Sequence, residues 1–315
     1  MSNPSLSATR LNITKLLSDP SPILKLNGIP ILTRGNISTI VGPPKSRKTF
    51  LSSMLVASVF SKRLFDFSSD SGAVKILWID TEQAMKHCAK TYRRINTLRG
   101  NAEDCDQPDL IFLCFRDFSA KERFSMTKEA IESYRPDLVV IDGVADLIEE
   151  NNNEHDASDL QDFLLQTTAK FNNHIIAVIH SNVGSEKARG HTGSNLVRKC
   201  ETIMQLSPAD ASSKVSFTSR DVKPHDFAFA IDDDGLPFPC ELPNRKKPNK
   251  RQILKAVLNK GEAIPYNSLV ERVVDYRKQC DSPISVSTAK QFITAVFKEG
   301  LIKCCDRKYS LSNKV

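Results

Sequence analysis

The sequence predicts an α/β protein with two parts: a core built on a mostly parallel sheet, residues 1–244, and a small second domain, residues 245–315. Three observations support this. Short β-branched runs alternate with segments of helical period in the first part. These runs are apolar along nearly their whole length, which is typical of strands buried on both faces of a sheet. A polar, basic, proline-containing stretch at residues 243–252 then marks the start of a different pattern.

The elements of the core are expected in the following order. A lead-in rich in Ser, Pro and Asn, residues 1–30, ends in a short extended pairing element. Five buried strands follow at residues 37–42, 74–80, 110–115, 137–142 and 174–181. Amphipathic helices are expected between them at residues 48–65, 83–98, 125–135 and 157–172. Two later strands are expected at residues 200–207 and 214–220, and a segment at 227–237 ends in a turn.

Composition excludes several classes of protein. The chain has 315 residues, 40% of them hydrophobic, which is enough for a buried core. Its eight cysteines form no C-x-x-C pair and have no histidine at zinc-ligand spacing, so we expect free thiols and neither a metal site built on them nor a disulfide framework. No apolar run reaches 18 residues, and the N-terminus lacks the features of a signal peptide. We therefore expect a cytoplasmic protein without a membrane partner.

The basic charge of the chain belongs to its C-terminal part. Residues 245–315 carry 16 Lys and Arg against 6 Asp and Glu, a balance of +10, whereas the whole chain carries +7. The first 244 residues are therefore slightly acidic. A basic run can be a solvated face or a nucleic-acid contact, and the pattern of the C-terminal part bears on that choice.

One motif predicts a phosphate-binding loop with a single departure. The stretch GPPKSRKTF follows a buried strand and precedes a helix, so backbone amides and the helix dipole would face a bound anion. Lys48 would reach the β and γ phosphates of ATP, and the Thr49 hydroxyl would bind Mg²⁺. The alternative is a strand-to-helix turn with surface lysines. The candidate nucleotide-binding residues are Gly42, Pro43, Pro44, Lys45, Ser46, Arg47, Lys48, Thr49 and Phe50.

Arg47 occupies the position that is normally the second glycine of this loop. A non-glycine residue there needs an ordinary helical dihedral or an altered loop path. Because residue 47 lies at the start of the helix, we expect the ordinary dihedral. Arg47 and Lys45 would both add positive charge near a polyphosphate.

Polar residues end three other predicted strands. Asp142 ends the strand at 137–142, in the arrangement called Walker B that places a carboxylate beside the metal, although strand-terminal aspartates are also common turn formers. Glu82 follows the strand at 74–80, where a carboxylate can orient or deprotonate a water molecule. His180 ends the fifth strand, at the edge where ligands of parallel sheets bind, although a lone histidine is often structural.

The order of these motifs resembles that of the RecA-like P-loop ATPases, most closely the branch of hexameric RepA-type helicases and RadA-like proteins. The loop also resembles that of ATPases on plasmids and mobile elements of the Bacteroidetes type. The resemblance covers roughly residues 25–240. It implies an ATP hydrolase with Mg²⁺, working as a homo-oligomer such as a hexamer, on single- or double-stranded DNA.

The resemblance also implies roles for individual residues. Glu82 would be the catalytic base, Asp142 and Thr49 would bind the metal, and His180 would sense the γ phosphate. Arg220, with Lys223 as second choice, would reach the nucleotide of a neighbouring subunit. Residues 190–199 resemble the DNA-facing loop and strand of that branch, and the DNA-contacting candidates are Arg189, His191, Arg198 and Lys199.

The C-terminal part predicts three helices and a two-stranded hairpin, a winged-helix arrangement. The third helix begins near Ser287 and ends at Gly300, and the hairpin turns at Asp306 and Arg307. The start of this helix would meet a major groove through Ser285, Ser287, Thr288, Lys290 and Gln291. Winged helices also dock proteins, so this alternative stays open.

Two functions follow from the sequence. The first is a Mg²⁺-dependent ATPase acting on DNA in replication, recombination or mobilisation of an element. The second is a nucleotide-binding regulator that recognises a DNA site through the winged helix and hydrolyses little ATP. Glu82 favours the enzyme and Arg47 favours the regulator.

Overall fold

The computed structural model describes residues 21–72, 74–150, 153–182, 188–209, 211–242, 248–259, 261–280 and 284–312. The predicted lead-in lies mostly outside this range, because its residues 1–20 are not described. Every helix in the described part is too short or too polar to cross a lipid bilayer.

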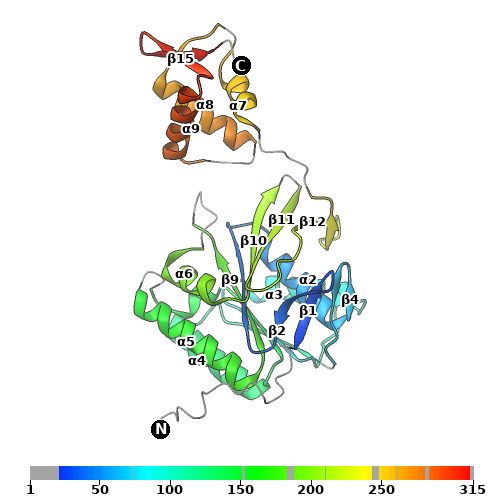
Figure 1. Cartoon of the computed structure of the whole chain (residues 1–315). Coiled ribbons are helices and arrows are strands. Elements are labelled where there is room, and N and C mark those ends of the chain that lie inside the picture. Colours follow the sequence, from blue (N-terminus) through cyan, green and yellow to red (C-terminus); the bar gives the residue numbers. More distant parts are fainter. Residues whose placement is uncertain are drawn as a thin grey trace, which may run out of the picture.

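A nine-stranded sheet forms the centre of the described core, with the strand order β13-β12-β11-β10-β3-β9-β8-β6-β7 (Figure 1). Six neighbouring strands are parallel, namely β3 (Ile37–Gly42), β6 (Ile76–Asp80), β7 (Leu110–Cys114), β8 (Leu138–Asp142), β9 (His174–His180) and β10 (Thr202–Ala209). Three more strands continue the sheet, each antiparallel to its neighbours, namely β11 (Ser212–Ser219), β12 (Phe227–Ile231) and β13 (Pro237–Cys240). The prediction of a mostly parallel sheet is confirmed.

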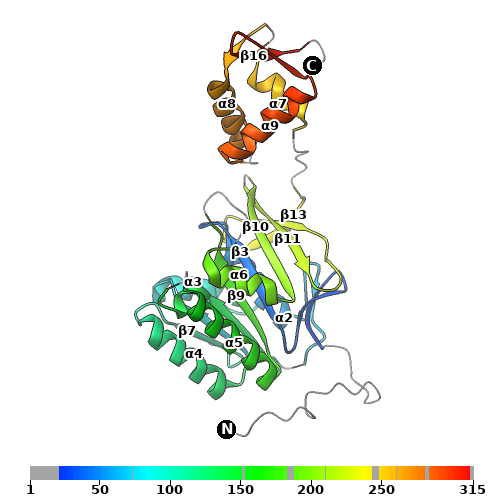
Figure 2. The ribbon, with the colours of Figure 1, turned by 60° about the vertical axis from the view of Figure 1, so that its left-hand side comes forward.

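Helices cover both faces of the sheet, as predicted. α2 (Lys48–Phe60) and α3 (Met85–Leu98) pack on one face, and α4 (Ala120–Tyr134), α5 (Glu154–Phe171) and α6 (Gly190–Lys199) on the other. Figure 2 shows α4 and α5 together on this face. The rings of Phe124 on α4 and Phe163 on α5 meet edge to face. Successive strand residues alternate between the two cores, so Trp78 belongs to one and Ile79 to the other.

A second, smaller sheet packs against α2, and it contains the first two strands of the described chain. Its strand order is β2-β1-β5-β4, made of β1 (Pro22–Leu26), β2 (Ile29–Thr33), β4 (Arg63–Leu64) and β5 (Phe67–Ser68). The extended pairing predicted near residue 30 is thus present. The helix predicted to reach residue 65 ends at Phe60 instead, because Lys62 and Phe65 adopt positive φ values of 59° and 55° and turn the chain into the β4–β5 hairpin.

Two helices begin earlier than predicted because their N-terminal caps lie upstream. Ser119 and Glu122 form a reciprocal capping box, so α4 starts at Ala120 rather than at residue 125. The Asn153 side chain accepts hydrogen bonds from two backbone amides at the start of α5. Both caps are visible in the sequence as a polar residue before the apolar period.

Residues 190–199 form the helix α6, so the expected loop and strand in this segment are wrong. Thr192 and Leu196, four residues apart, are both buried on one side of this helix. Gly193 allows a close approach to the preceding segment, because a Cβ there would lie 2.7 Å from Ala188. Packing against the sheet therefore stabilises this segment as a helix, although it contains two glycines.

The C-terminal residues contain the three helices and the hairpin that the sequence predicts. These are α7 (Lys250–Val257), α8 (Tyr266–Gln279), α9 (Val286–Lys298), β15 (Ile302–Cys305) and β16 (Lys308–Leu311), coloured yellow to red in Figure 1. Asp306 and Arg307 both have positive φ, as a tight two-residue hairpin turn requires. A third short strand, β14 (Ile264–Pro265), pairs with β16 and was not predicted. This unit has its own core around Leu254, Leu269 and Ile293.

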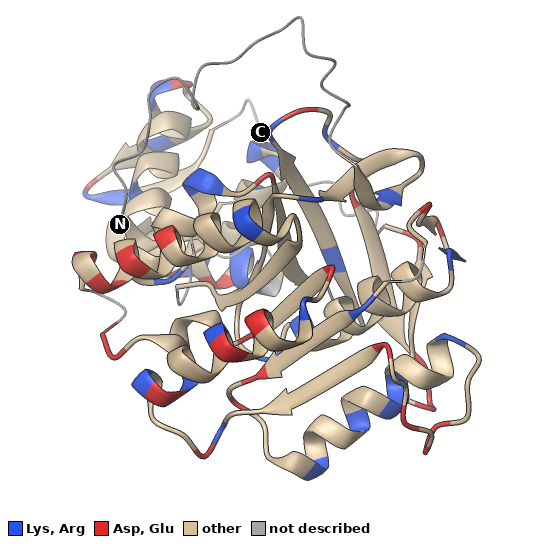
Figure 3. Cartoon of the chain, turned by 90° about the horizontal axis from the view of Figure 1, so that it is seen from below, with Lys and Arg blue, Asp and Glu red and all other residues tan. Residues whose placement is uncertain are grey.

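Charges are distributed unevenly over the helices of the core. α3 carries Lys and Arg and no acidic residue, whereas α5 carries four acidic residues and one lysine. Figure 3 shows charges of both signs on the face of the chain seen from below. The slightly acidic balance of residues 1–244 therefore combines helices of opposite charge.

Candidate functional site

The ends of the parallel strands bring the predicted site residues to one edge of the sheet. Gly42 at the end of β3 is in register with His180 at the end of β9, and Asp80 with Asp142. A pocket of about 520 Å³ opens at this edge. Its lining includes Lys48 of α2, Glu82 of the turn after β6, Asp142 of β8 and His180 of β9.

The phosphate loop keeps the path of a glycine-containing loop although it has an arginine. Arg47 has φ 69° and ψ 31°, a left-handed conformation, so the ordinary helical dihedral expected for it is wrong. Lys45 also has a positive φ, of 62°. Arg47 is held from outside the loop, since its guanidinium donates to the Ser213 hydroxyl at 3.3 Å. The residue thus adopts the conformation that glycine would normally provide.

Gly42 and Ser46 form the tight part of this loop. A Cβ at Gly42 would lie 2.6 Å from the Ser46 hydroxyl oxygen, so only glycine fits there. The Ser46 hydroxyl is buried and has no hydrogen-bond partner within the described residues. A buried polar atom of this kind usually has a partner, and an anion in the loop is one candidate.

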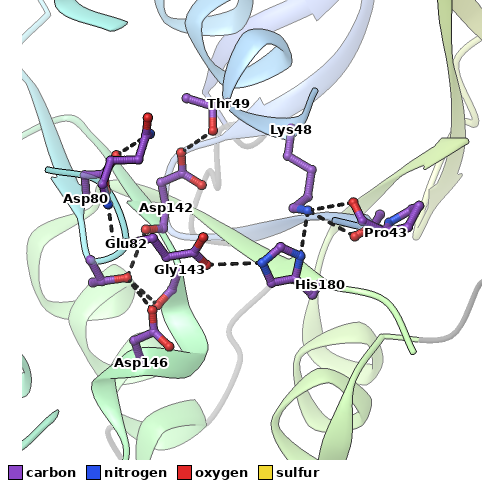
Figure 4. Close-up of polar contacts among 12 residues, drawn as sticks. Pro43, Lys48, Thr49, Asp80, Glu82, Asp142, Gly143, Asp146 and His180 are labelled. Carbon is purple, nitrogen blue, oxygen red and sulfur yellow. Dashed lines mark hydrogen bonds and ion pairs between the residues drawn. The ribbon is translucent and has the colours of Figure 1, made fainter. Parts of the chain in front are cut away.

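The Lys48 amine lies at the centre of the site. It donates hydrogen bonds of 3.1 Å to the carbonyl oxygens of Gly42 and Pro43, and it lies 2.9 Å from Nδ1 of His180 (Figure 4). Burial lowers the pKa of Lys48, while the nearby carboxylates of Asp142 and Glu82 oppose this shift. The amine therefore points along the loop toward the strand that carries His180.

His180 connects the loop lysine to the predicted base. Because an ammonium group can only donate, Nδ1 accepts from Lys48 and the other ring nitrogen carries the proton. That nitrogen, Nε2, lies 3.2 Å from Oε1 of Glu82. The hydrogen bond from His180 holds the pKa of Glu82 below its ordinary value, so this carboxylate is ionised at neutral pH and can accept a proton.

The turn after β6 places Glu82 by means of Asp80. The buried Asp80 carboxylate accepts hydrogen bonds from the backbone amides of Glu82 at 3.0 Å and Gln83 at 2.7 Å. It also accepts one from the Gln83 side chain at 2.7 Å. Burial raises the pKa of Asp80, and these three donors oppose the rise. Asp80 thus positions the turn, whereas Glu82 is the carboxylate that faces the pocket.

Thr49 and Asp142 fit a hard cation. The Thr49 hydroxyl donates to Oδ2 of Asp142 at 2.7 Å. Burial raises the pKa of Asp142 to about 7, with a further contribution from Asp80. Among the described residues, no group of three or more His, Cys, Asp or Glu is placed to hold a metal by itself. One hydroxyl and one carboxylate suit Mg²⁺ bound jointly with substrate phosphates.

A second carboxylate near Glu82 was missed in the sequence. Asp146 lies in the 3₁₀ helix η1 (Val144–Leu147) and accepts a hydrogen bond of 2.9 Å from the Thr81 hydroxyl. Gly143 makes this contact possible, because its φ is 104° and a Cβ there would lie 2.0 Å from the Thr81 oxygen. Burial raises the pKa of Asp146. The signal in the sequence was the glycine directly after the strand-terminal aspartate.

One wall of the pocket, formed by α3, was also missed. His87, Lys90 and Arg94 all line it, and their spacing of three and four residues places them on one face of the helix. The Arg94 guanidinium lies 3.7 Å from the ring centre of Phe50, and burial lowers the pKa of Arg94 to about 10. The spacing of these three residues in the sequence could have predicted this polar face of the helix.

Arg220, which was predicted to reach the nucleotide of a neighbouring subunit, does not lie at the pocket of its own chain. It follows β11, whose last residue pairs with Thr202, and Thr202 pairs with Ser38 near the start of β3. The phosphate loop leaves the other end of β3, four residues further along and so roughly 14 Å away at about 3.4 Å per residue. Arg220 donates to the Lys199 carbonyl oxygen at 2.9 Å, and Lys223 pairs with Asp226 at 3.5 Å.

The DNA-contacting candidates separate into three places. Arg189 lines the pocket at the ends of the parallel strands. His191, Arg198 and Lys199 are exposed on α6. Lys290 lies on the exposed face of α9, beside a shallow groove of about 420 Å³ lined by Ser287, Lys290, Gln291, Thr294, Ala295 and Lys298.

Comparison with known proteins identifies the family to which the sequence is similar. A sequence profile described as "AAA domain" matches residues 3–186, more than half of the chain. No curated protein matches the sequence. Among solved structures, the crystal structure of the RadB recombinase is similar, with 18% sequence identity and a TM-score of 0.49, over 68% of this chain and 94% of that one.

Proposed function

The chain belongs to the AAA domain family, and on this premise we propose that it is a Mg²⁺-dependent ATPase of the RecA-like P-loop class that acts on DNA. The core, residues 1–244, would carry the hydrolysis. The C-terminal part, residues 245–315, would be a winged-helix domain that contacts DNA. Work in replication, recombination or mobilisation of a mobile element would suit a protein of this kind.

One observation carries the proposal. His180 contacts Lys48 through one ring nitrogen and Glu82 through the other, at 2.9 Å and 3.2 Å. The residue proposed to bind the phosphates and the residue proposed to activate water are therefore joined by a third residue on the strand between them. A plain strand-to-helix turn with surface lysines would not bury Lys48, which is only 8% exposed.

The proposed chemistry is in-line attack of water on the γ phosphorus. Glu82 orients the water and accepts its proton, and Lys48 binds the β and γ phosphates. Mg²⁺, held by Thr49 and Asp142, would supply neutralising charge to the same phosphates. His180 keeps Glu82 ionised and lies where a change at the γ phosphate would reach it. Charge stabilisation rather than a covalent intermediate would lower the barrier.

The proposal for DNA rests on charge and on the face of α9. The C-terminal part has a balance of +10. The groove along α9 is lined mainly by polar and basic residues at helical spacing, while Val286 and Phe297 of the same helix are also exposed. A helix face of this kind suits insertion in a major groove, with Lys303, Arg307 and Lys308 of the hairpin near phosphates. Arg220 remains a prediction for a subunit interface, which a hexamer or other homo-oligomer would provide.

The test is ATP turnover by the full chain with Mg²⁺, with and without single- and double-stranded DNA. We expect turnover by the parent, and we expect Glu82→Gln to bind ATP but to turn it over about 10²- to 10⁴-fold more slowly. Glu129→Gln, an exposed carboxylate on α4, is the matched control and should behave as the parent. Turnover of Glu82→Gln within a few-fold of the parent would contradict the assignment of the base.

A nucleotide-binding regulator remains the second candidate. The shallow polar groove along α9 supports it, because site-specific DNA recognition by such a face needs no hydrolysis. In the sequence, Arg47 favoured the regulator because it replaces a loop glycine. Its left-handed conformation weakens that argument, since Arg47 adopts the backbone conformation that glycine would normally provide. Tight ATP binding without turnover, in the presence and absence of DNA, would favour the regulator.

A further inference from the structure

Arg189 lies in the wall of the nucleotide pocket, in the same lining as Lys48, Glu82 and His180. The sequence placed it among the DNA contacts. We propose instead that Arg189 is a catalytic residue that stabilises, within its own chain, the charge on the phosphate being transferred. This inference rests on the proposed ATPase function and adds a residue to it.

The backbone of Arg189 is fixed relative to His180. Its N–H donates to the His180 carbonyl oxygen at 2.9 Å, and its own carbonyl oxygen accepts from the Gly193 N–H at 3.1 Å. Ser181 and Ala188 form a bridge between the two segments. A Cβ at Gly193 would lie 2.7 Å from Ala188, so close packing holds this segment against α6. The backbone position from which the Arg189 side chain starts is therefore fixed beside His180.

The guanidinium of Arg189 is available, whereas several other cations of the pocket are occupied. Lys48 donates to two loop carbonyls, and Arg47 to Ser213. Arg94 stacks on Phe50 and donates to the Gly235 carbonyl oxygen at 3.2 Å. Within the described residues, the exposed Arg189 side chain has no hydrogen bond or ion pair. Since it starts beside His180, it can reach an anion on the Glu82 side of the pocket.

The proposed reaction explains what the positive charge of Arg189 would do. The water oxygen forms a bond to the γ phosphorus, the bond from that phosphorus to the bridging oxygen of ADP breaks, and the water proton passes to the Glu82 carboxylate. Negative charge develops on the bridging and equatorial oxygens. An arginine directed at those oxygens contributes about 10³- to 10⁵-fold to turnover in comparable P-loop enzymes.

The first experiment compares Arg189→Ala and Arg189→Gln with Arg116→Ala, an exposed arginine outside the pocket, in the full chain. We expect the Arg189 variants to lose at least about 100-fold in kcat, with KM for ATP changed only a few-fold. Their affinity for ADP with aluminium fluoride, a mimic of the transferred phosphate, should fall by a similar factor. Arg116→Ala should match the parent in each assay. Unchanged thermal unfolding would show that the Arg189 variants are folded.

The second experiment tests whether Arg189 acts within its own chain. Arg189→Ala mixed with Lys48→Ala should recover no turnover, because no pocket of the mixture then has both residues. Recovery would overturn the inference and assign Arg189 to a neighbouring subunit's pocket. Normal kcat in Arg189→Ala combined with weakened DNA binding would also overturn it and return the residue to the DNA surface. If the parent itself has no turnover, the proposed function fails and this inference fails with it.

Discussion

The Arg47 guanidinium donates a hydrogen bond of 3.3 Å to the Ser213 hydroxyl, so a strand far along the chain holds the residue that replaces a loop glycine. The same hydroxyl donates to the Ser46 carbonyl oxygen at 3.2 Å. Ser213 thus restrains two consecutive residues of the phosphate loop from β11. This explains how an arginine can adopt a left-handed conformation that ordinarily costs about 1–2 kcal/mol.

Substitution of Arg47 by glycine should leave the nucleotide site intact. Arg47→Gly fits the observed φ of 69°, so ATP affinity should stay within a few-fold and the free energy of unfolding within about 1 kcal/mol of the parent. Lys48→Ala, by contrast, should abolish detectable ATP binding in calorimetry with Mg²⁺. Equal loss in both variants would show that Arg47 itself binds the phosphates.

Gly143 should be intolerant of any side chain. Gly143→Ala forces a Cβ to within 2.0 Å of the Thr81 oxygen at a φ of 104°, so we expect a loss of roughly 1–3 kcal/mol in the free energy of unfolding. The control is Gly72→Ala, where a Cβ would meet no atom within 4 Å. Urea denaturation of both variants measures the difference. Equal stability of the two would mean that the turn after β8 can rearrange freely.

The parts of the structure that were predictable are those set by local pattern. The five core strands and the motifs at their ends follow from apolar runs and from loop chemistry, and parallel strands bring such ends together. The β4–β5 hairpin was not predictable, because it depends on positive φ at Lys62 and Phe65, residues without that local preference. The conformation of Arg47 likewise depends on Ser213, which is near it only in the folded chain.

Acid should destabilise the protein through His174. This buried residue donates from Nδ1 to the Thr33 carbonyl oxygen, and burial lowers its pKa from 6.5 to about 4. Between these values the unfolded chain binds the proton that the folded chain rejects, so stability is present above pH 6.5 and is lost as pH falls toward 4. The free energy of unfolding should drop by roughly 2 kcal/mol from pH 7 to pH 5 through this group.

The measurement for His174 is urea denaturation at both pH values. His174→Asn should remove most of the pH dependence, whereas the exposed His155→Asn should keep it. The neighbouring Glu201 has its pKa raised by burial, so its own titration works in the opposite direction and makes the observed drop smaller. An unchanged pH dependence in His174→Asn would contradict the assignment.

DNA affinity should depend on salt and on α9. Each neutralised phosphate contributes a slope of about −0.9 in log K against log salt for duplex DNA. Lys290→Glu, on the exposed face of α9, should therefore weaken duplex binding and reduce the slope by about one contact. Lys255→Glu, exposed on α7, makes the same change of charge away from that face. Equal effects of the two variants would indicate non-specific attraction or docking of a protein.

The contact between Arg94 and Gly235 joins two regions that the strand order keeps apart. Arg94 lies against Phe50 beside the phosphate loop, and Gly235 lies in the turn between β12 and β13, the last strand before the C-terminal part. Arg94 therefore links the packing beside the phosphate loop to the turn that precedes the last strand of the core. A substitution of Arg94 should disturb both places at once.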